Sequence, residues 1–197
     1  MIINYGDPDI NLLTRKALPG AIKNDLNKNP AWASWRTLRH KQPPIEAWLQ
    51  THHGLLKTIS KIETATAALM DVQPSELNRT IRFCNLLEGC QHLVLHLEQH
   101  QIVEEQIYFP KFVAIIPRLK APIEMLDHDH IVLEQLMHDA NIVLDKLATM
   151  KPKRADIARL HQITARLHRG LKTHIQHEED IIMPDLLEIG IERLLID

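Results

Sequence analysis

Apolar residues recur at intervals of three and four along most of the chain, and alternating apolar and polar stretches are almost absent. This period is typical of amphipathic α-helices that bury one face. Prolines and polar turns interrupt the pattern: Pro44 and Pro122 suit the first turn of a helix, whereas Pro74 and Pro152 suit loops. The pattern predicts four long helices, at residues 45–70, 75–108, 121–148 and 153–188.

The loops between these helices are short, and short connections favour antiparallel neighbours. The sequence therefore predicts an all-α protein whose residues 45–190 form an up-down-up-down four-helix bundle. Only six glycines and 4% aromatic residues agree with that class. Residues 1–44 are less regular, and we expect an N-terminal extension that packs on the bundle and contains a short helix near residues 31–39. Trp32 and Trp35 would cover the surface beneath it.

Composition and charge narrow the range of partners. The formal net charge is −2 and the chain has no long run of Lys and Arg, so nucleic acid is not an expected partner. The first ten residues carry Asp and Pro where a signal peptide needs a basic and then an apolar region. No apolar run approaches the 18 residues of a membrane span. We therefore expect a cytoplasmic protein without a membrane partner.

Two cysteines, Cys84 and Cys90, fall in the second predicted helix. Their spacing of six residues sets them about 240° apart around the helix axis. They cannot bridge each other within that helix, and we expect both to be small buried side chains.

The 13 histidines are the unusual feature of the composition, and several interrupt apolar stripes. His52 interrupts the stripe of the first helix and His130 that of the third. In the second helix His100 follows Leu93 and Leu97 and precedes Val103 and Ile107, and in the fourth helix His174 follows Leu167 and Leu171. Each helix thus turns one histidine towards the bundle interior.

A duplicated segment adds carboxylates to this set. HQIVEEQIYFP (residues 100–110) and HIQHEEDIIMP (174–184) each place a glutamate, Glu104 or Glu178, four residues after the histidine. Residues four apart share a helix face, so each His and Glu can reach one ion, and a buried carboxylate requires a cation. Imidazole with carboxylate and no thiolate suits Fe, Mn or Zn. Six ligands are about right for two metals bridged by carboxylates: His52, His100, Glu104, His130, His174 and Glu178.

Several positions near these residues compete for the same role. His52 is favoured over His53 because apolar residues continue along its face, and His130 over His128 for the same reason. His96 lies one turn before His100 and could be a ligand, a proton relay or a residue lining the end of the bundle, as could His92. Glu105 and Glu179 point about 100° away from the paired glutamates, so we expect them to be exposed or to support a ligand. Surface, rim or supporting positions are expected for His40, His138, His161, His168 and His177.

These residues resemble the hemerythrin-like, or HHE cation-binding, family over about residues 45–188. The two HxxxEE…P segments carry the resemblance, together with His52 and His130. It implies a four-helix bundle around an oxo- or hydroxo-bridged non-haem di-iron centre, with zinc or manganese as alternative occupants. Glu104 and Glu178 would bridge the two irons, and the four inward histidines would be terminal ligands.

Two departures from the oxygen carriers of that family bear on function. One turn after His130 stands Glu134 in place of a further histidine, and the last motif keeps the HxxxE interval. Reversible oxygen transport is therefore not expected, and Glu134 is a candidate third carboxylate. The leading hypothesis is a di-iron protein that meets O2, NO or peroxide as a sensor, a store or an iron donor under stress. The alternatives are a di-iron oxidase or peroxidase and a helical interaction protein without redox activity. A homodimer is possible on this view.

Overall fold

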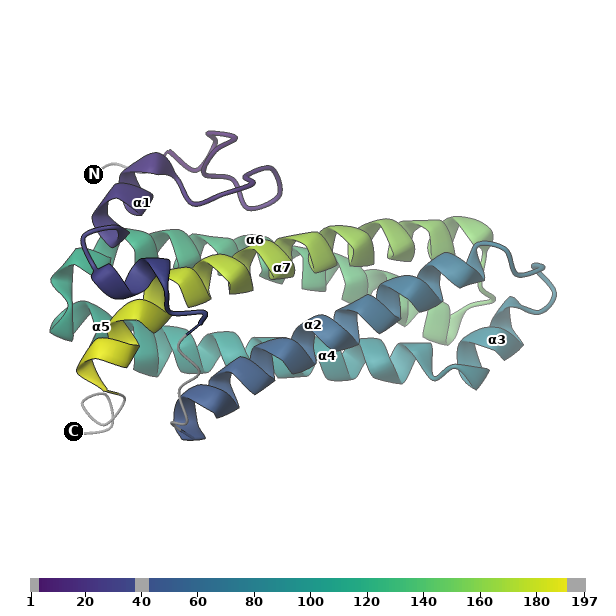
Figure 1. Cartoon of the computed structure of the whole chain (residues 1–197). Coiled ribbons are helices and arrows are strands. Elements are labelled where there is room, and N and C mark those ends of the chain that lie inside the picture. Colours follow the sequence, from purple (N-terminus) through teal and green to yellow (C-terminus); the bar gives the residue numbers. More distant parts are fainter. Residues whose placement is uncertain (1–3, 38–42, 191–197) are drawn as a thin grey trace.

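Four long helices lie side by side in the computed structural model, which describes residues 4–37 and 43–190 (Figure 1). They are α2 (Pro43–Leu69), α4 (Leu86–Val103), α6 (Lys120–Thr149) and α7 (Arg154–Ile189). α7 packs on α6 and α2, and α4 packs on α2 and α6. The predicted all-α class and helical bundle are confirmed.

Proline determines where three of the long helices begin. α2 starts at the Pro43-Pro44 pair, and Pro122 lies in the first turn of α6, where a missing backbone N–H costs nothing. Pro152 lies in the short connection from α6 to α7. The ammonium group of Lys146 donates a hydrogen bond to the Asp156 carboxylate across this connection.

The second predicted helix is not continuous, which corrects the prediction of one helix over 75–108. A short helix, α3 (Leu77–Phe83), ends before Asn85, whose φ of +49° is left-handed and stops the helix. Asparagine tolerates this conformation better than most residues. Cys84 is exposed at this break, so the expectation that both cysteines are buried is wrong for Cys84 and right for Cys90.

The same chain segment does not end at residue 108. A π-helical turn, η2 (Glu104–Tyr108), leads into α5 (Phe109–Ile115) and then η3 (Pro117–Leu119). A π turn contains one residue more than an α turn and so rotates the following positions around the axis. Phe109 and Phe112 are buried as a result, whereas Ile107, which the α-helical period places inward, is 47% exposed. Val103, which was also expected on the inward face, precedes the turn and is 38% exposed.

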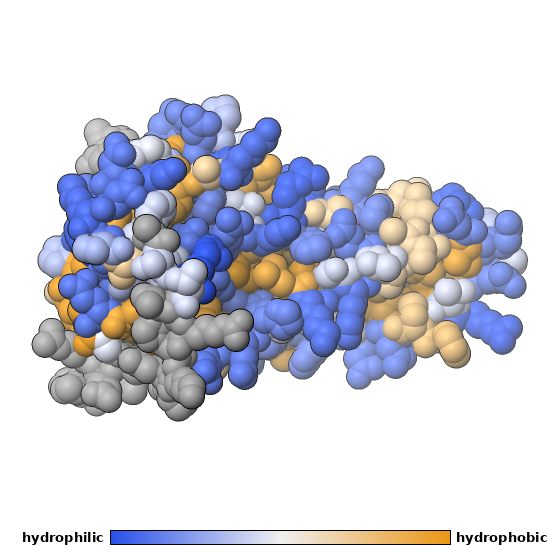
Figure 2. Space-filling view, in the orientation of Figure 1, coloured by the Kyte–Doolittle hydropathy of each residue, from blue (hydrophilic) through white to orange (hydrophobic). Residues whose placement is uncertain are grey.

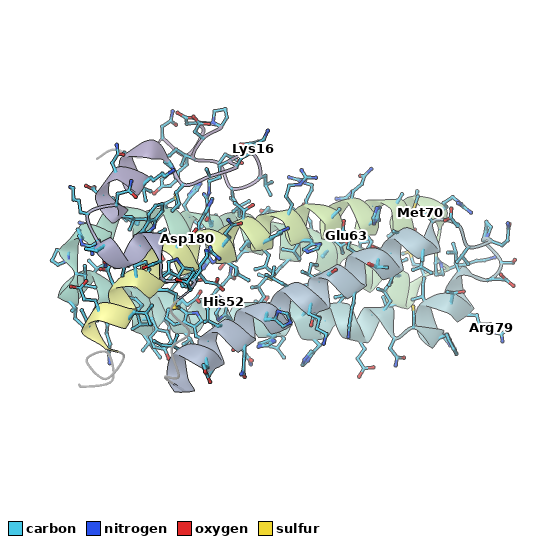
Figure 3. All side chains as sticks on the ribbon, viewed as in Figure 1. Lys16, His52, Glu63, Met70, Arg79 and Asp180 are labelled. Atoms are coloured by element: carbon cyan, nitrogen blue, oxygen red, sulfur yellow. The ribbon has the colours of Figure 1, made fainter. Side chains whose placement is uncertain are left out.

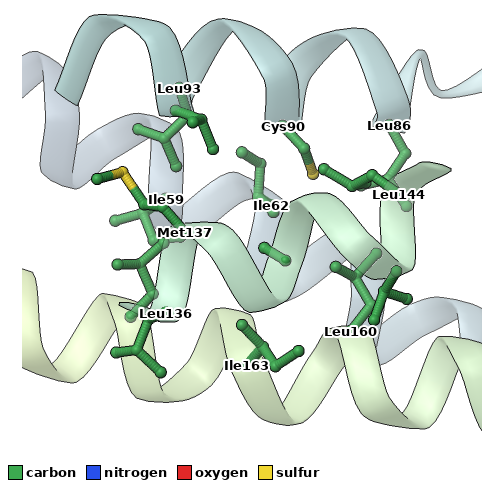
Figure 4. Packing of buried hydrophobic residues seen from close by; sticks show 14 of the residues in the cluster. Ile59, Ile62, Leu86, Cys90, Leu93, Leu136, Met137, Leu144, Leu160 and Ile163 are labelled. Atoms are coloured by element: carbon green, nitrogen blue, oxygen red, sulfur yellow. The ribbon is translucent and has the colours of Figure 1, made fainter. Parts of the chain in front are cut away.

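Two apolar clusters fill the interior. The larger lies along most of the bundle and draws leucine, isoleucine and methionine from all four long helices, as Figure 4 shows around Ile59, Leu93 and Met137. The smaller surrounds Trp48, Phe112 and Leu126 at the end that carries α5. Burying one such large side chain stabilises the fold by about 1.5–3 kcal/mol, so these clusters hold the helices together.

The N-terminal residues lie against the outside of the bundle and reach both clusters. Leu12 belongs to the larger cluster, while Ile22 and Leu26 of α1 (Gly20–Leu26) belong to the smaller. The predicted short helix near 31–39 is a 3₁₀ turn, η1 (Pro30–Ala33); its last two predicted residues and His40 lie outside the described residues. Trp35 is buried and its indole N–H donates to Asp180 at 3.0 Å.

Polar side chains cover most of the face shown in Figure 2, with apolar patches between them. Among the described helices, none combines the length and apolar character needed to cross a membrane.

Candidate metal centre

The apolar stripes of all four long helices are interrupted at one level of the bundle. On α2, His52 lies between Trp48 of the smaller cluster and Leu55 of the larger. Figure 3 places His52 towards the end that the N-terminal residues cover. The interrupting residues are His52 on α2, His100 on α4 with Glu104 one turn later, His130 on α6, and His174 and Glu178 on α7. The structure thus brings all six predicted ligands together.

Glu104 lies among three imidazoles. Its Oε1 is 2.9 Å from His100 Nε2 and 3.8 Å from His52 Nε2, while its Oε2 is 3.4 Å from His130 Nε2. The side chains of Glu104, His52 and His130 are each only 1% exposed, and that of His100 is 9% exposed. The carboxylate is therefore surrounded by nitrogen atoms from three helices.

Glu178 closes the other side of the cluster. Its Oε2 is 3.3 Å from His52 Nε2 and 3.7 Å from His174 Nε2. His174 Nε2 in turn lies 3.2 Å from His130 Nε2. The six side chains consequently form one continuous set of nitrogen and oxygen atoms.

Within this set, two groups of ligand atoms are close enough to hold an ion each. One group contains His52, His100, Glu104 and Glu178, and the other contains Glu104, His130 and His174; in each, the ligand atoms lie within 4.8 Å of one another. Because Glu104 belongs to both groups, the two candidate sites adjoin through its carboxylate. A third, more exposed group consists of Glu105, Asp127 and His130.

Three of the four imidazoles are oriented by a carboxylate on the far side of the ring. Each Nδ1 lies near an acidic side chain, which leaves Nε2 turned towards the cluster. This arrangement supports metal-binding histidines in many proteins, because it sets the ring orientation and the tautomer. The pairs are His52 with Glu179 (3.0 Å), His130 with Glu105 (2.6 Å) and His174 with Asp129 (3.4 Å).

The cluster carries unusual proton affinities. Burial opposes charge on His52 and His130, but the neighbouring glutamates outweigh it and raise the pKa of each to about 10. Burial lowers the pKa of His174 to about 4. Burial and the adjacent Glu104 raise the pKa of Glu178 well above its usual value, whereas the surrounding imidazoles hold the pKa of Glu104 well below it despite its burial. Protons on His52 and His130 therefore supply the positive charge that a bound cation would supply.

Five ligand atoms lack a hydrogen-bond partner among the described residues. They are Nε2 of His100 and both carboxylate oxygens of Glu104 and Glu178. A buried carboxylate oxygen without a donor costs several kcal/mol, on the order of the desolvation energy of the group. A bound cation removes this cost by accepting electron pairs from all five atoms, so the residues present fit a metal centre.

Comparison with protein families agrees with this geometry. The model of the hemerythrin HHE cation binding domain matches residues 43–156 and also residues 121–196. The chain belongs to this family. The resemblance stated from the two HxxxEE…P segments is thus confirmed, and with it the general expectation of cation binding. Searches of curated proteins and of solved structures found no match.

One ligand atom of this hemerythrin domain is engaged by a protein donor. Trp48 Nε1–H donates to His52 Nε2 at 2.8 Å, from one turn earlier on α2. The same indole stacks on Tyr108, with ring centroids 5.3 Å apart. In the neutral form of His52, this hydrogen bond occupies the Nε2 lone pair that a metal would use, so metal binding at His52 requires the indole to move.

The remaining candidates from the sequence lie outside the two main ligand groups. His53 and Glu134 are exposed, and His96 is half-buried on α4. His128 is half-buried and its ring stacks on Tyr5 at 3.7 Å between centroids. His53 and His128 each stand next to a buried residue and so face another direction, whereas His96 and Glu134 lie one turn from His100 and His130 but nearer to solvent.

Two residues that support the hemerythrin site, Arg15 and Asp129, were not singled out from the sequence, whereas His177 was placed among the surface, rim or supporting positions. Asp129 precedes His130 and approaches His174, so it belongs to the α7 side of α6. The buried guanidinium of Arg15 donates two hydrogen bonds to Asp129 and one, from Nε, to His177 Nδ1 at 3.0 Å. Burial and the neighbouring Arg15 lower the pKa of His177 to about 4, so this ring is a neutral acceptor. In the sequence, the one available signal for these supporting residues was that an acidic residue, Asp129, stands next to His130.

Proposed function

We propose that this hemerythrin domain holds two iron ions in the His and Glu cluster and that the pair meets a small oxidising ligand, namely O2, NO or peroxide. The observation that carries the proposal is the pair of adjoining ligand groups that share Glu104. In this proposal Glu104 and Glu178 bridge the ions, and His52, His100, His130 and His174 complete their coordination.

The donor set favours iron over zinc. Four imidazole nitrogens and two carboxylates exceed what one tetrahedral zinc ion uses, and nitrogen with oxygen donors suits non-haem iron. Cys90 lies in the larger apolar cluster and Cys84 is exposed beside the α3 break, so neither thiol joins the six ligands. An iron pair would supply electrons and an open coordination position for a small molecule.

Gln101, the residue after His100, is a candidate partner for the small ligand. It lies one turn before Glu104 on α4, is 2% exposed, and neither polar atom of its amide has a hydrogen-bond partner among the described residues. The corresponding residue of the duplicated segment, Ile175, is apolar. An unpaired buried amide is costly, so a bound molecule or water that pairs with Gln101 would be stabilised there.

Metal content tests the first part of the proposal. Protein purified anaerobically from iron-supplemented culture should contain close to two irons per chain and gain a charge-transfer absorption band in air. A Glu104→Gln/Glu178→Gln variant should lose most of this iron. The control Glu98→Gln, at an exposed position on α4, should keep it. Less than one metal per chain, or zinc with no spectral change, would refute the di-iron proposal.

Ligand titration tests the second part. Azide added to the oxidised protein and NO added to the reduced protein should change the absorption spectrum. Gln101→Leu should weaken ligand binding by roughly 2- to 10-fold, the effect of losing one hydrogen bond of about 0.5–1.5 kcal/mol. Iron-loaded protein whose spectrum does not respond to either molecule would contradict the ligand-binding role.

A further inference from the structure

Three histidines form a row along α4 that leads away from the candidate metal centre. His92, His96 and His100 are spaced four residues apart and so lie along one side of the helix. His92 is exposed, His96 is half-buried, and the His100 side chain is 9% exposed. The row therefore starts in solvent and ends at a residue of the cluster.

Ring contacts occur at the outer and the inner end of this row. The ring centroids of His92 and His96 are 6.2 Å apart. At the inner end, the His100 ring lies 5.0 Å from that of His52. An ion held between the outer two rings would lie about six residues along the helix from His100, a rise of roughly 9 Å.

The duplicated half of the domain has no such row. Counting back from His174 in the same steps leads to Gly170 and Arg166. Gly170 is buried, and a Cβ placed on it would lie 3.3 Å from Leu13 and 3.3 Å from Leu133. The N-terminal residues thus close the α7 side, and Figure 1 shows the segment up to α1 beside α6 and α7, away from α2 and α4. The α4 side, by contrast, carries the row of histidines that reaches from solvent to the cluster.

Two imidazoles one turn apart on a helix can chelate one divalent transition-metal ion, because both nitrogens reach the same point above the helix surface. Imidazole suits Fe²⁺, Zn²⁺, Co²⁺ and Ni²⁺ among such ions. We propose that His92 and His96 form a capture site for a divalent transition-metal ion, which then passes to His100 and into the cluster. The transfer step rests on the function proposed above, whereas the capture step does not.

The capture step is tested in a background that lacks the two carboxylates of the cluster. Calorimetric titration of Glu104→Gln/Glu178→Gln protein with Zn²⁺ should detect one ion more than the same protein that also carries His92→Ala/His96→Ala, because the cluster imidazoles and the group of Glu105, Asp127 and His130 are the same in both. Adding His53→Ala/His138→Ala instead, which removes two imidazoles from other surfaces, should leave the ion bound. Equal Zn²⁺ binding with and without His92 and His96 would overturn the capture site.

The transfer step is tested by the rate of metal uptake into otherwise unchanged protein. Stopped-flow mixing with Fe²⁺ under anaerobic conditions should show slower loading of His92→Ala/His96→Ala protein, with the same final iron content as the parent. Loading at the parent rate would overturn the transfer step. If the parent protein takes up no iron at all, the proposed di-iron function fails, while the Zn²⁺ titration still decides the capture site.

Discussion

The buried ion pair between Arg15 and Asp129 provides a strict test of how the N-terminal residues support the bundle. The side chains are 0% and 1% exposed, respectively. Replacing Arg15 by leucine leaves the Asp129 carboxylate in the interior without its cation. Removing one partner of a buried pair costs about 3–5 kcal/mol.

That cost is a large part of the total stability of a domain, which is about 5–15 kcal/mol. For a domain of this size, a loss of 1 kcal/mol lowers Tm by about 2–4 °C, so Arg15→Leu should lower Tm by roughly 6–20 °C. Urea unfolding followed by circular dichroism measures the loss of unfolding free energy, and a thermal scan measures the change in Tm. Both are done on metal-free protein in a chelator, so that metal binding does not contribute. Lys16→Leu, at the exposed neighbouring position labelled in Figure 3, should change stability by no more than about 0.5 kcal/mol.

A double-mutant cycle separates the charge effect from the loss of packing. Arg15→Leu/Asp129→Leu removes both charges and should be more stable than either single variant. It should still fall below the parent by about 1–3 kcal/mol, because His177 and the Ile10 carbonyl lose their donor. A loss below 1 kcal/mol in Arg15→Leu, or single effects that simply add in the double variant, would refute the inference that a buried charge pair ties these segments together.

Three further predictions concern packing, thiol reactivity and pH. Gly170→Val should lower the unfolding free energy by about 1–3 kcal/mol, because its side chain would collide with the leucines that cover it. Gly54→Ala, in open space on α2, should raise it by about 0.5–1 kcal/mol in the same denaturation assay, and equal effects at the two glycines would contradict the packing described. A thiol-specific reagent should modify only Cys84 in the native protein, because Cys90 is buried and burial raises its pKa to about 12; rapid modification of both thiols before denaturation would refute this. The hydrogen bond from Lys146 lowers the pKa of Asp156. The stabilisation of the fold by this pair, at most about 1 kcal/mol, should therefore be present at neutral pH and disappear as the pH falls through the lowered pKa of Asp156. Thermal unfolding of Asp156→Asn beside the parent at pH 7 and pH 3 checks this, and a gap between the two that is as large at pH 3 as at pH 7 would contradict it.

Local periodicity explains which features of this protein can be predicted from the chain alone. A helix repeats every 3.6 residues, so the spacing of leucines around His52 and His130 already determines that these histidines share a face with the core. The same rule pairs His100 with Glu104 and His174 with Glu178. The four-helix architecture follows from proline positions and short loops, and the family membership follows from the duplicated motif.

Features that depend on a change of helix geometry could not be predicted in this way. The π turn after Val103 inserts one extra residue into the helix, and this places Phe109 rather than Ile107 against the interior. The two motifs differ at this point, since Tyr108 and Phe109 stand where the second motif has Ile182 and Met183, and the second motif remains α-helical through Pro184. The turn is decided by packing, in which Phe109 stacks on His130 with ring centroids 5.8 Å apart.

By itself, then, the sequence determined the all-helical class, the inward faces of the first, third and fourth long helices and the six residues that meet at one level of the bundle, because these depend on spacing within single helices. Only the tertiary structure decided which side chains support that cluster. Arg15 and Asp129 are separated by 114 residues and meet because the N-terminal segment packs across α6 and α7. The carboxylates beside His52 and His130 likewise come from other helices, so their role depends on how the helices pack and not on any pattern within one of them.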